Sequence, residues 1–502
     1  MKTHHPNPLS MGLLTLLLLP PALLALHVPH LPRPYEGCTT ILAAGNATLD
    51  GSILLGKNRD LREFDAQWLY HSPRQSHPPN STVRLQYIEI PQVDVTWAWI
   101  GFKTNIERWG IGMGINEWGV AVADNDAPTR EPLEGLRGLH DNDICRLILE
   151  RCRTAREGVE LVGHLIEVYG HADVGEIYFI ADPEEGWIVE AAGHHWAAVR
   201  VRDGVAVRGN QFEIGDRWDL GSEDLVDYAV KMGWCSSPEE FDFAECYSPG
   251  GYPYRSSRER VERILQLLRP KVGSITPVDL MEVLRDHYEG TSLYYVDPHH
   301  NPRHRTICTY RTVASMVAHL RPGLPREMQV IHCCMASPCT GVYVPVYASV
   351  EGVPEPYLEG FSHQEDVESA WWAFKRVQLM VEENHSGLQP RVRALWEGFV
   401  EEVEREREEI EAEALRLLEG GDREEAVKLL GEFVEDRLME AYHRALELPE
   451  LVERGGGEEE RRRGLPTYLA LIASTAALST VVAYLWLRRR FANPLNPGRW
   501  CR

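Results

Sequence analysis

The chain has 502 residues, of which 44% are hydrophobic and 25% are charged, so it is long enough to bury a large core. Its formal net charge of −23 excludes a general nucleic-acid-binding protein, because such proteins need a basic face. Ten cysteines are too few for a disulfide scaffold in a chain of this length.

The first predicted element is an apolar segment near the start of the chain. Residues 11–28 follow Lys2 and contain two adjacent prolines, a pattern typical of a signal peptide or a signal anchor. The Pro-rich stretch 29–37 that follows does not favour regular structure. We therefore expect residues 1–37 to be a signal peptide and propeptide that are removed from the mature protein.

From residue 38 onward the pattern changes to alternating blocks of strand and helix. Two β-rich runs flank Asp50 and Gly51, a dipeptide typical of a hairpin turn. Further strands are expected at residues 83–90, 109–124, 176–181, 186–191 and 196–201. Helical periodicity is found at residues 141–169, 257–268 and 277–287. This alternation predicts an α+β or layered domain over residues 38–390.

The chain then becomes rich in Glu, Arg, Leu and Ala. Oppositely charged residues recur at a spacing of four, which predicts a Glu-rich helical extension over residues 391–453. This extension is compatible with a stalk or with a surface on which a homo-oligomer assembles. Residues 454–466 are hydrophilic and are expected to be a linker.

A second apolar segment follows the linker. Residues 467–487 carry no charge and are long enough to cross a hydrocarbon core of about 30 Å. Three arginines begin the tail 488–502 and favour its placement in the cytoplasm. The sequence thus predicts a single-pass protein of the cell membrane, attached through residues 467–487, with residues 38–453 on the extracytoplasmic side.

Cys38 is the first residue with a pattern that suggests chemistry. A cysteine becomes a nucleophile when a base takes its proton, and a chain that begins with cysteine carries such a base in its α-amino group, with a pKa of about 7.7–8. The predicted hairpin folds residues 56–60 back beside Cys38, so Asp60 can bind the α-amine and Lys57 can stabilise a thiolate. The same pattern also fits a core cysteine beside a surface ion pair. Self-cleavage and cleavage by another protease remain alternative routes to a free Cys38.

Six segments in chain order carry a resemblance to a known family. They are CTTI…DGS…GKNRD (38–60), GINEWGV (114–120), IADP…WIVE (180–190), RDHYEGT (285–291), ICTYRT (307–312) and SAWWAF (369–374). Together they resemble peptidase family C69, the dipeptidases of the N-terminal nucleophile hydrolases, which include the secernins. The resemblance implies a four-layer αββα sandwich, amide hydrolysis of small peptides through a cysteine thioester, and no metal or organic cofactor.

The resemblance also implies roles for individual residues. Cys38 is the nucleophile, and Asp60 holds its free α-amine. Lys57 occupies a position where many relatives, including the secernins, carry arginine. Asn210 resembles an asparagine whose side chain donates a hydrogen bond to the oxyanion, and a backbone N–H near Asn125 is the second expected donor. Such donors contribute to rate because they meet charge that develops only in the transition state.

Three other residues in these motifs are candidates for substrate binding, namely Asn116, Arg285 and His287. The charged segment 285–289 fits a helix cap as well as a substrate site.

Two clusters contain residue types that can bind metals, but we expect neither cluster to be a metal site. Pro302 breaks any helix that would place His299, His300 and His304 on one face, so we expect a polar loop there. Cys333, Cys334 and Cys339 are expected to be buried thiols or to form one bridge.

We therefore expect an exported, membrane-anchored cysteine dipeptidase that acts on small peptides. Two alternatives remain. The first is a choloylglycine-type hydrolase of N-acyl amides, which would have the same fold but a substrate with a different acyl group. The second is a non-catalytic, secernin-like surface binding protein, in which Cys38 never becomes the N-terminal residue.

Overall fold

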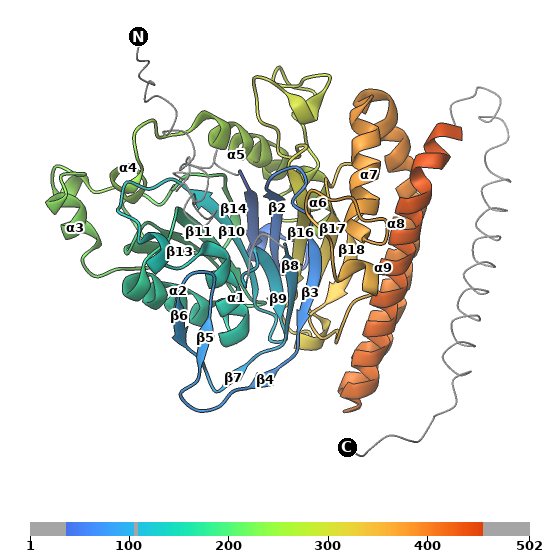
Figure 1. Ribbon diagram of the computed structural model, residues 1–502, viewed down its shortest axis with the longest axis horizontal. Helices are drawn as coiled ribbons and strands as arrows, with labels where there is room; N and C mark the ends of the chain where they lie inside the picture. The colour runs from blue at the N-terminus through green and yellow to red at the C-terminus, as the bar shows by residue number, and fades with distance from the viewer. Residues whose placement is uncertain (1–36, 105–108, 455–502) are drawn as a thin grey trace, which may run out of the picture. The chain divides into compact units, whose positions relative to one another are not determined.

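The computed structural model describes residues 37–104 and 109–454, which belong to one compact unit (Figure 1). The predicted leader, the linker after residue 454, the membrane segment 467–487 and the tail 488–502 lie outside these residues, and so their predictions stand as predictions. Among the helices of the described residues, none combines the length and the apolar character needed to cross a membrane.

The first of the two main sheets is antiparallel. Within the described residues its strands follow the order β14-β1-β2-β16-β17-β18. Their bounds are β1 (Thr39–Ala44), β2 (Ile53–Asp60), β14 (Gly204–Arg208), β16 (Thr312–Leu320), β17 (Val330–Met335) and β18 (Val344–Tyr347). The predicted first hairpin is confirmed: β1 pairs with β2, Thr40 faces Lys57, and Gly51 in the connection has a φ of 77°.

The second main sheet has the strand order β15-β13-β12-β11-β10-β9-β8-β3 within the described part of the chain. Its strands are β3 (Trp68–Ser72), β8 (Trp99–Lys103), β9 (Met113–Asn116), β10 (Ala121–Ala127), β11 (Gly175–Ala181), β12 (Gly186–Ala191), β13 (Trp196–Val201) and β15 (Leu220–Gly221). The strands predicted at 176–181, 186–191 and 196–201 are confirmed as β11, β12 and β13.

Two of the predicted strands are each divided by a turn. Residues 83–90 form a small hairpin of β5 (Thr82–Arg84) and β6 (Glu89–Pro91) instead of one strand. Residues 109–124 contain β9 and most of β10, joined by a turn at Gly119, whose φ of 81° favours glycine. Another short pair consists of β4 (Gln75–Ser76) and β7 (Val95–Thr96).

Helices cover the outer faces of both main sheets (Figure 1). On the second sheet lie α1 (Asp141–Arg151) and α2 (Ala155–Tyr169), and on the first lie α5 (Arg255–Leu268) and α6 (Pro277–Leu284). The predicted helix 141–169 is interrupted because Thr154 caps α2, its side chain accepting a hydrogen bond from the N–H of Glu157. The described residues thus form the four layers αββα.

The remaining helices of the sandwich are short. They are α3 (Leu225–Lys231), α4 (Phe243–Tyr247) and the 3-10 helices η1 (Gly45–Ala47), η2 (Gly135–Arg137), η3 (Pro238–Glu240), η4 (Arg269–Lys271), η5 (Pro298–His300), η6 (Arg326–Met328) and η7 (Glu355–Tyr357). A disulfide between Cys235 and Cys246 joins the segment after α3 to α4.

The core follows from the period-two alternation of the central strands. Leu42 and Leu55 on the first sheet belong to the same buried cluster as Ile115 and Phe179 on the second. The opposite faces of the same strands carry separate apolar clusters against the outer helices. Both faces of the first sheet are covered, so β1 and β2 consist entirely of buried residues. The apolar first half of β2 fits a strand buried on both faces, and its second half carries the buried polar residues Lys57 to Asp60.

Three long helices follow the sandwich, namely α7 (Ala370–Glu382), α8 (His385–Glu419) and α9 (Arg423–Arg454). The predicted helical stretch 391–453 is confirmed as helical, with a break after Glu419. Helices α8 and α9 pack on each other, and α9 runs along β18 (Figure 1). Val346 of β18 and Phe433 of α9 belong to the cluster that fills the space between the sheets, so this helix pair shares the main core.

Trp396 of α8 should carry a large part of this packing. Its ring is 1% exposed and stacks on Phe374, with 5.9 Å between ring centroids. Its indole N–H donates to the carbonyl of Thr340 at 3.1 Å. We expect Trp396→Ala to lower the free energy of unfolding by about 3–5 kcal/mol, measured by urea denaturation. Val400 on the same helix is 38% exposed, so Val400→Ala should change the free energy of unfolding by less than about 0.5 kcal/mol. Equal losses in both variants would contradict this assignment.

Candidate active site

Cys38 lies directly before β1 and is buried, with 7% of its surface exposed. Because Thr39 pairs with Asn58, the register of the hairpin brings Cys38 beside the end of β2. Burial raises the pKa of the Cys38 thiol to about 11, and the nearby positive charge of Lys57 opposes this rise. In the uncleaved chain the thiol is therefore protonated at neutral pH.

Lys57 is completely buried and held from three sides. Its Nζ donates to the carbonyl oxygens of Gly112 and Asp124, at 3.1 and 2.5 Å, and forms an ion pair with the carboxylate of Asp124. Burial alone would lower the pKa of Lys57, but the charge of Asp124 raises it above the ordinary value. Lys57 thus keeps its positive charge within electrostatic range of the Cys38 sulfur.

Asp60, at the end of β2, is also completely buried. One carboxylate oxygen accepts a hydrogen bond from Thr312 Oγ1 at 2.6 Å, and the other accepts one from Arg305 Nη2 at 2.7 Å. Burial raises the pKa of Asp60 although the guanidinium of Arg305 opposes the rise. Its carboxylate also acts electrostatically on the Cys38 thiol.

The carbonyl of Gly37 precedes the nucleophile candidate and is held by two guanidinium groups. Arg305 Nη2 donates to it at 2.6 Å and Arg260 Nη1 at 3.4 Å. A Cβ on residue 37 would lie 1.7 Å from Arg305 Nη1. Glycine at this position therefore allows Arg305 to approach the peptide bond before Cys38.

The two predicted asparagines flank the start of β1. Asn210 Oδ1 accepts from Arg260 Nη2 at 2.8 Å, and Asn210 Nδ2 donates to the carbonyl of Asp126 at 3.0 Å. Asn125 Oδ1 accepts from Thr40 Oγ1 at 2.7 Å. The structure thus gathers Cys38, Lys57, Asp60, Asn125 and Asn210 around one end of the β1–β2 hairpin.

Sequence reasoning missed the two arginines. Arg260 Nη1 also donates to the carbonyl of Cys38 at 2.7 Å, and burial lowers the pKa of Arg260 to about 10. The sequence does contain a signal that Arg260 is buried. Arg260 precedes Ile264 and Leu268 at steps of four, which places it on the apolar, buried face of α5. The only sequence signal for a role of Arg305 is its position, two residues before the motif that begins at Ile307.

The structure does not bring the three candidate substrate residues into contact with Cys38. Asn116 lies in the β9–β10 turn, where its side chain donates to the carbonyls of Leu149 and Cys152 at 3.0 and 2.8 Å. Its Oδ1 accepts from two backbone N–H groups of the same turn, each at 3.0 Å.

The other two lie beyond the end of α6. Arg285 Nε donates to the carbonyl of Pro338 at 2.9 Å, and its Nη1 pairs with Glu282 at 2.5 Å. His287 is 1% exposed, and its Nδ1 lies 2.8 Å from a carboxylate oxygen of Glu289. The roles of Asn116, Arg285 and His287 in substrate binding stay predictions.

The expected polar loop at His299, His300 and His304 is wrong for His299. Its side chain is fully buried, with Nδ1 at 2.7 Å from Glu382 and Nε2 at 3.2 Å from the sulfur of Cys339. The cause is packing of η5 against α7, which the local sequence does not reveal. Cys333, Cys334 and Cys339 are buried and unbridged, as one of the two expectations for them stated.

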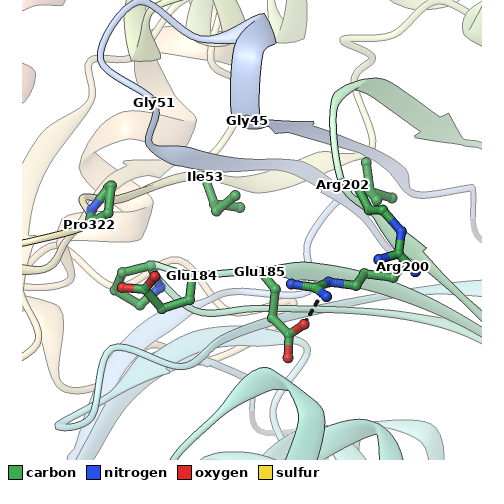
Figure 2. A pocket seen from close by; sticks show the side chains of 10 residues that line it. Gly45, Gly51, Ile53, Glu184, Glu185, Arg200, Arg202 and Pro322 are labelled. Atoms are coloured by element: carbon green, nitrogen blue, oxygen red, sulfur yellow. Dashed lines mark ion pairs between the residues drawn. The ribbon is translucent and has the colours of Figure 1, made fainter.

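A surface pocket of about 310 Å³ opens at the opposite end of the β1–β2 hairpin (Figure 2). It is lined by Gly45, Gly51, Ile53, Pro183, Glu184, Glu185, Arg200, Val201, Arg202 and Pro322. Glu185 and Arg200 form an ion pair across it at 2.7 Å. The length of β1, about 20 Å at about 3.3 Å per residue, separates this pocket from Cys38, so the two are distinct places in the fold.

Comparison with known proteins shows the family of this chain. The model of peptidase family C69 matches residues 37–272 and 253–398, a range that begins one residue before Cys38. The chain belongs to peptidase family C69. A probable dipeptidase of Salmonella dublin is 28% identical over 359 residues, which cover 62% of this chain and 80% of that protein. Probable dipeptidase A of Streptococcus pyogenes serotype M3 (strain SSI-1) is 23% identical over 395 residues, covering 70% and 84%.

Two solved structures are also similar to the chain. Penicillin V acylase from Agrobacterium tumefaciens is 14% identical with a TM-score of 0.37, covering 62% of this chain and 86% of that one. A mutant conjugated bile acid hydrolase from Clostridium perfringens is 14% identical with a TM-score of 0.34, covering 59% and 89%.

The charge of Lys57 should set the reactivity of Cys38. Because Lys57 lowers the pKa of the thiol, Lys57→Met should raise that pKa beyond its present value of about 11. The thiolate fraction at a given pH should then fall about tenfold for each unit of pKa. Alkylation of Cys38 measures this change when it is located by peptide mass spectrometry across a pH series and compared between wild-type and variant chains that have the same N-terminus.

Two further variants control for the loss of the ion pair. Lys57→Arg keeps the charge and should keep the midpoint of the pH series. The double variant Lys57→Met, Asp124→Asn removes both charges and avoids a buried, unpaired carboxylate. An unchanged midpoint in Lys57→Met would refute the electrostatic role of Lys57.

Proposed function

We propose that this protein is a cysteine dipeptidase whose nucleophile is Cys38, freed as the N-terminal residue by removal of residues 1–37. The observation that carries the proposal is the peptide bond between Gly37 and Cys38. It lies among buried charged groups, and its carbonyl accepts hydrogen bonds from Arg305 and Arg260. Membership of a peptidase family and the dipeptidase names of two relatives support the reaction class.

The first step in this proposal is cleavage of the chain by its own nucleophile. The thiol of Cys38 attacks the carbonyl carbon of Gly37, and Arg305 and Arg260 stabilise the negative charge on its oxygen. The C–N bond breaks, the thiol proton passes to the departing α-amine, and a thioester joins residue 37 to the sulfur. Water then hydrolyses the thioester, which releases the leader with a carboxylate and restores the thiol.

Peptide hydrolysis by the mature protein reuses the same atoms. The free α-amine takes the proton of the Cys38 thiol, and the positive charge of Lys57 stabilises the thiolate. The thiolate attacks the carbonyl carbon of the small peptide, while the Asn210 side chain and a backbone N–H near Asn125 donate to the oxyanion. The C–N bond breaks as the α-ammonium, held by Asp60, protonates the leaving amine, and a thioester remains on Cys38. Water, activated by the α-amine of Cys38, hydrolyses this thioester, which releases a carboxylate and restores the thiol.

The same proposal includes the location of the protein. We place the hydrolase domain on the extracytoplasmic side of the cell membrane, attached through residues 467–487. The disulfide between Cys235 and Cys246 supports an oxidising compartment, because such bonds are rare in the reducing cytosol.

N-terminal sequencing of the purified protein tests the nucleophile. We expect the mature chain to begin at Cys38, and we expect Cys38→Ala to retain residue 37 because no nucleophile remains. Cys38→Ser keeps a weaker nucleophile and should process more slowly. The mature protein should then release free amino acids from a panel of dipeptides.

Two outcomes favour the alternatives. A wild-type terminus upstream of residue 38 would remove the α-amine base and leave the non-catalytic binding protein. A terminus at Cys38 with hydrolysis of N-acyl amides and none of dipeptides would favour the acylase.

The oxyanion role of Asn210 has its own test. Asn210→Ala should lower kcat for a dipeptide by about 10²–10³-fold with little change in KM, because the lost hydrogen bond forms only in the transition state. Steady-state kinetics on the mature protein separates the two constants. Val400→Ala is the comparison, since Val400 is 38% exposed on α8 and this variant should leave kcat within about threefold. A drop in thermal stability without a drop in kcat would assign Asn210 a structural role instead.

A further inference from the structure

A cluster of histidines and cysteines lies inside the protein, apart from the residues that surround Cys38. His287, His299, His385 and Cys339 each offer one ligand atom, and the four atoms lie within 4.8 Å of one another. All four residues are buried. The sulfur of a fifth residue, Cys308, lies 3.7 Å from Nε2 of His299.

These residues come from separate segments that only the folded chain brings together. His287 follows α6, His299 belongs to η5, Cys339 lies between β17 and β18, and His385 begins α8. The three imidazole rings form a nearly regular triangle, with centroids 5.1–5.2 Å apart. Convergence of these side chains on one point is a geometry that a single shared ligand explains.

Carboxylates orient two of the three rings. Glu289 lies 2.8 Å from Nδ1 of His287, and Glu382 lies 2.7 Å from Nδ1 of His299. A metal-binding histidine commonly donates its second ring N–H to a carboxylate in this manner, which fixes the tautomer that leaves Nε2 for the metal. The cluster therefore has both a set of ligands and the groups that orient them.

Two buried ring nitrogens of this cluster lack ordinary partners, whereas Nε2 of His299 lies 3.2 Å from the sulfur of Cys339. Within the described residues, Nε2 of His287 and Nε2 of His385 are buried and form no hydrogen bond of standard geometry. A buried polar atom without a partner is destabilising, so natural proteins avoid such atoms unless water, an ion or a function explains them. An ion at the centre of the triangle would satisfy both.

We propose that His287, His299, His385 and Cys339 bind one Zn²⁺ ion in a closed, structural site. Three imidazole nitrogens and one thiolate are donors that zinc prefers, and four protein ligands complete a tetrahedron. With bonds of about 2.0–2.1 Å to nitrogen and 2.3 Å to sulfur, neighbouring ligand atoms are separated by roughly 3.3–3.6 Å. The Cys339 sulfur and His299 Nε2 are 3.2 Å apart, close to that separation. The Cys308 sulfur, 3.7 Å from His299 Nε2, lies beside this set and is not one of the four ligands.

The ion would stabilise the segment that holds Arg305. Tyr288, next to His287, donates its hydroxyl hydrogen to the carbonyl of Arg305 at 2.7 Å. The N–H of Cys308 donates to the carbonyl of Asp286 at 3.3 Å. Zinc would thus link both sides of the loop that places the Arg305 guanidinium on Gly37. The metal site itself does not depend on the proposed peptidase activity.

Metal analysis of the full chain tests the site. The chain is produced with ZnCl₂, dialysed against metal-free buffer and measured by inductively coupled plasma mass spectrometry. We expect about one zinc per chain in the wild type and a drop of about tenfold or more in His385→Ala. His300→Ala is the matched control, because His300 lies beside His299 in η5, its side chain is 47% exposed, and the variant should keep its zinc.

Cobalt substitution keeps the test valid if His385→Ala does not fold. Wild-type protein produced with CoCl₂ should show the strong visible bands of tetrahedral cobalt and a thiolate-to-cobalt charge-transfer band. The double variant Cys308→Ser, Cys339→Ser should lose the charge-transfer band. A metal-free wild type, a His385→Ala variant that retains zinc, or a peptide map with a disulfide between Cys308 and Cys339 would each overturn the proposal.

Discussion

The carbonyl of Gly37 is buried at the start of the first strand, and a buried carbonyl requires hydrogen-bond donors. Arg305 and Arg260 supply them. Arg260 is buried and Arg305 is partly exposed, and the carboxylate of Asp60 accepts a hydrogen bond from Arg305. The polar cluster around Cys38 therefore follows from one constraint. The buried carbonyl that needs hydrogen-bond donors belongs to the peptide bond directly before the proposed nucleophile.

Local signals in the sequence were sufficient for the parts of the site that lie on one hairpin. Asp50 and Gly51 mark a turn between two β-rich apolar runs, so the sequence alone predicts a hairpin that places Lys57 and Asp60 beside Cys38. The strands β11, β12 and β13 were equally predictable, because each is a short β-rich run between turn residues. The predicted strand boundaries are wrong where a turn falls inside an apolar run, as at Gly119.

The parts that escaped prediction depend on long-range packing. Arg260 and Arg305 lie more than 200 residues from Gly37 along the chain, and only the stacking of α5 on the first sheet places Arg260 against it. His299 and His300 are neighbours with the same chemistry, yet one is buried among cysteines and histidines and the other is exposed. No local pattern separates them, because the difference is made by α7 and α8.

Helix α9 packs along β18, the last strand of the first sheet. An edge strand ordinarily presents a row of unpaired N–H and C=O groups that can recruit a strand from another chain. A helix of 32 residues along this border opposes the addition of a strand from a second copy at β18. Covering an edge strand with a helix is one way in which proteins protect a sheet from aggregation.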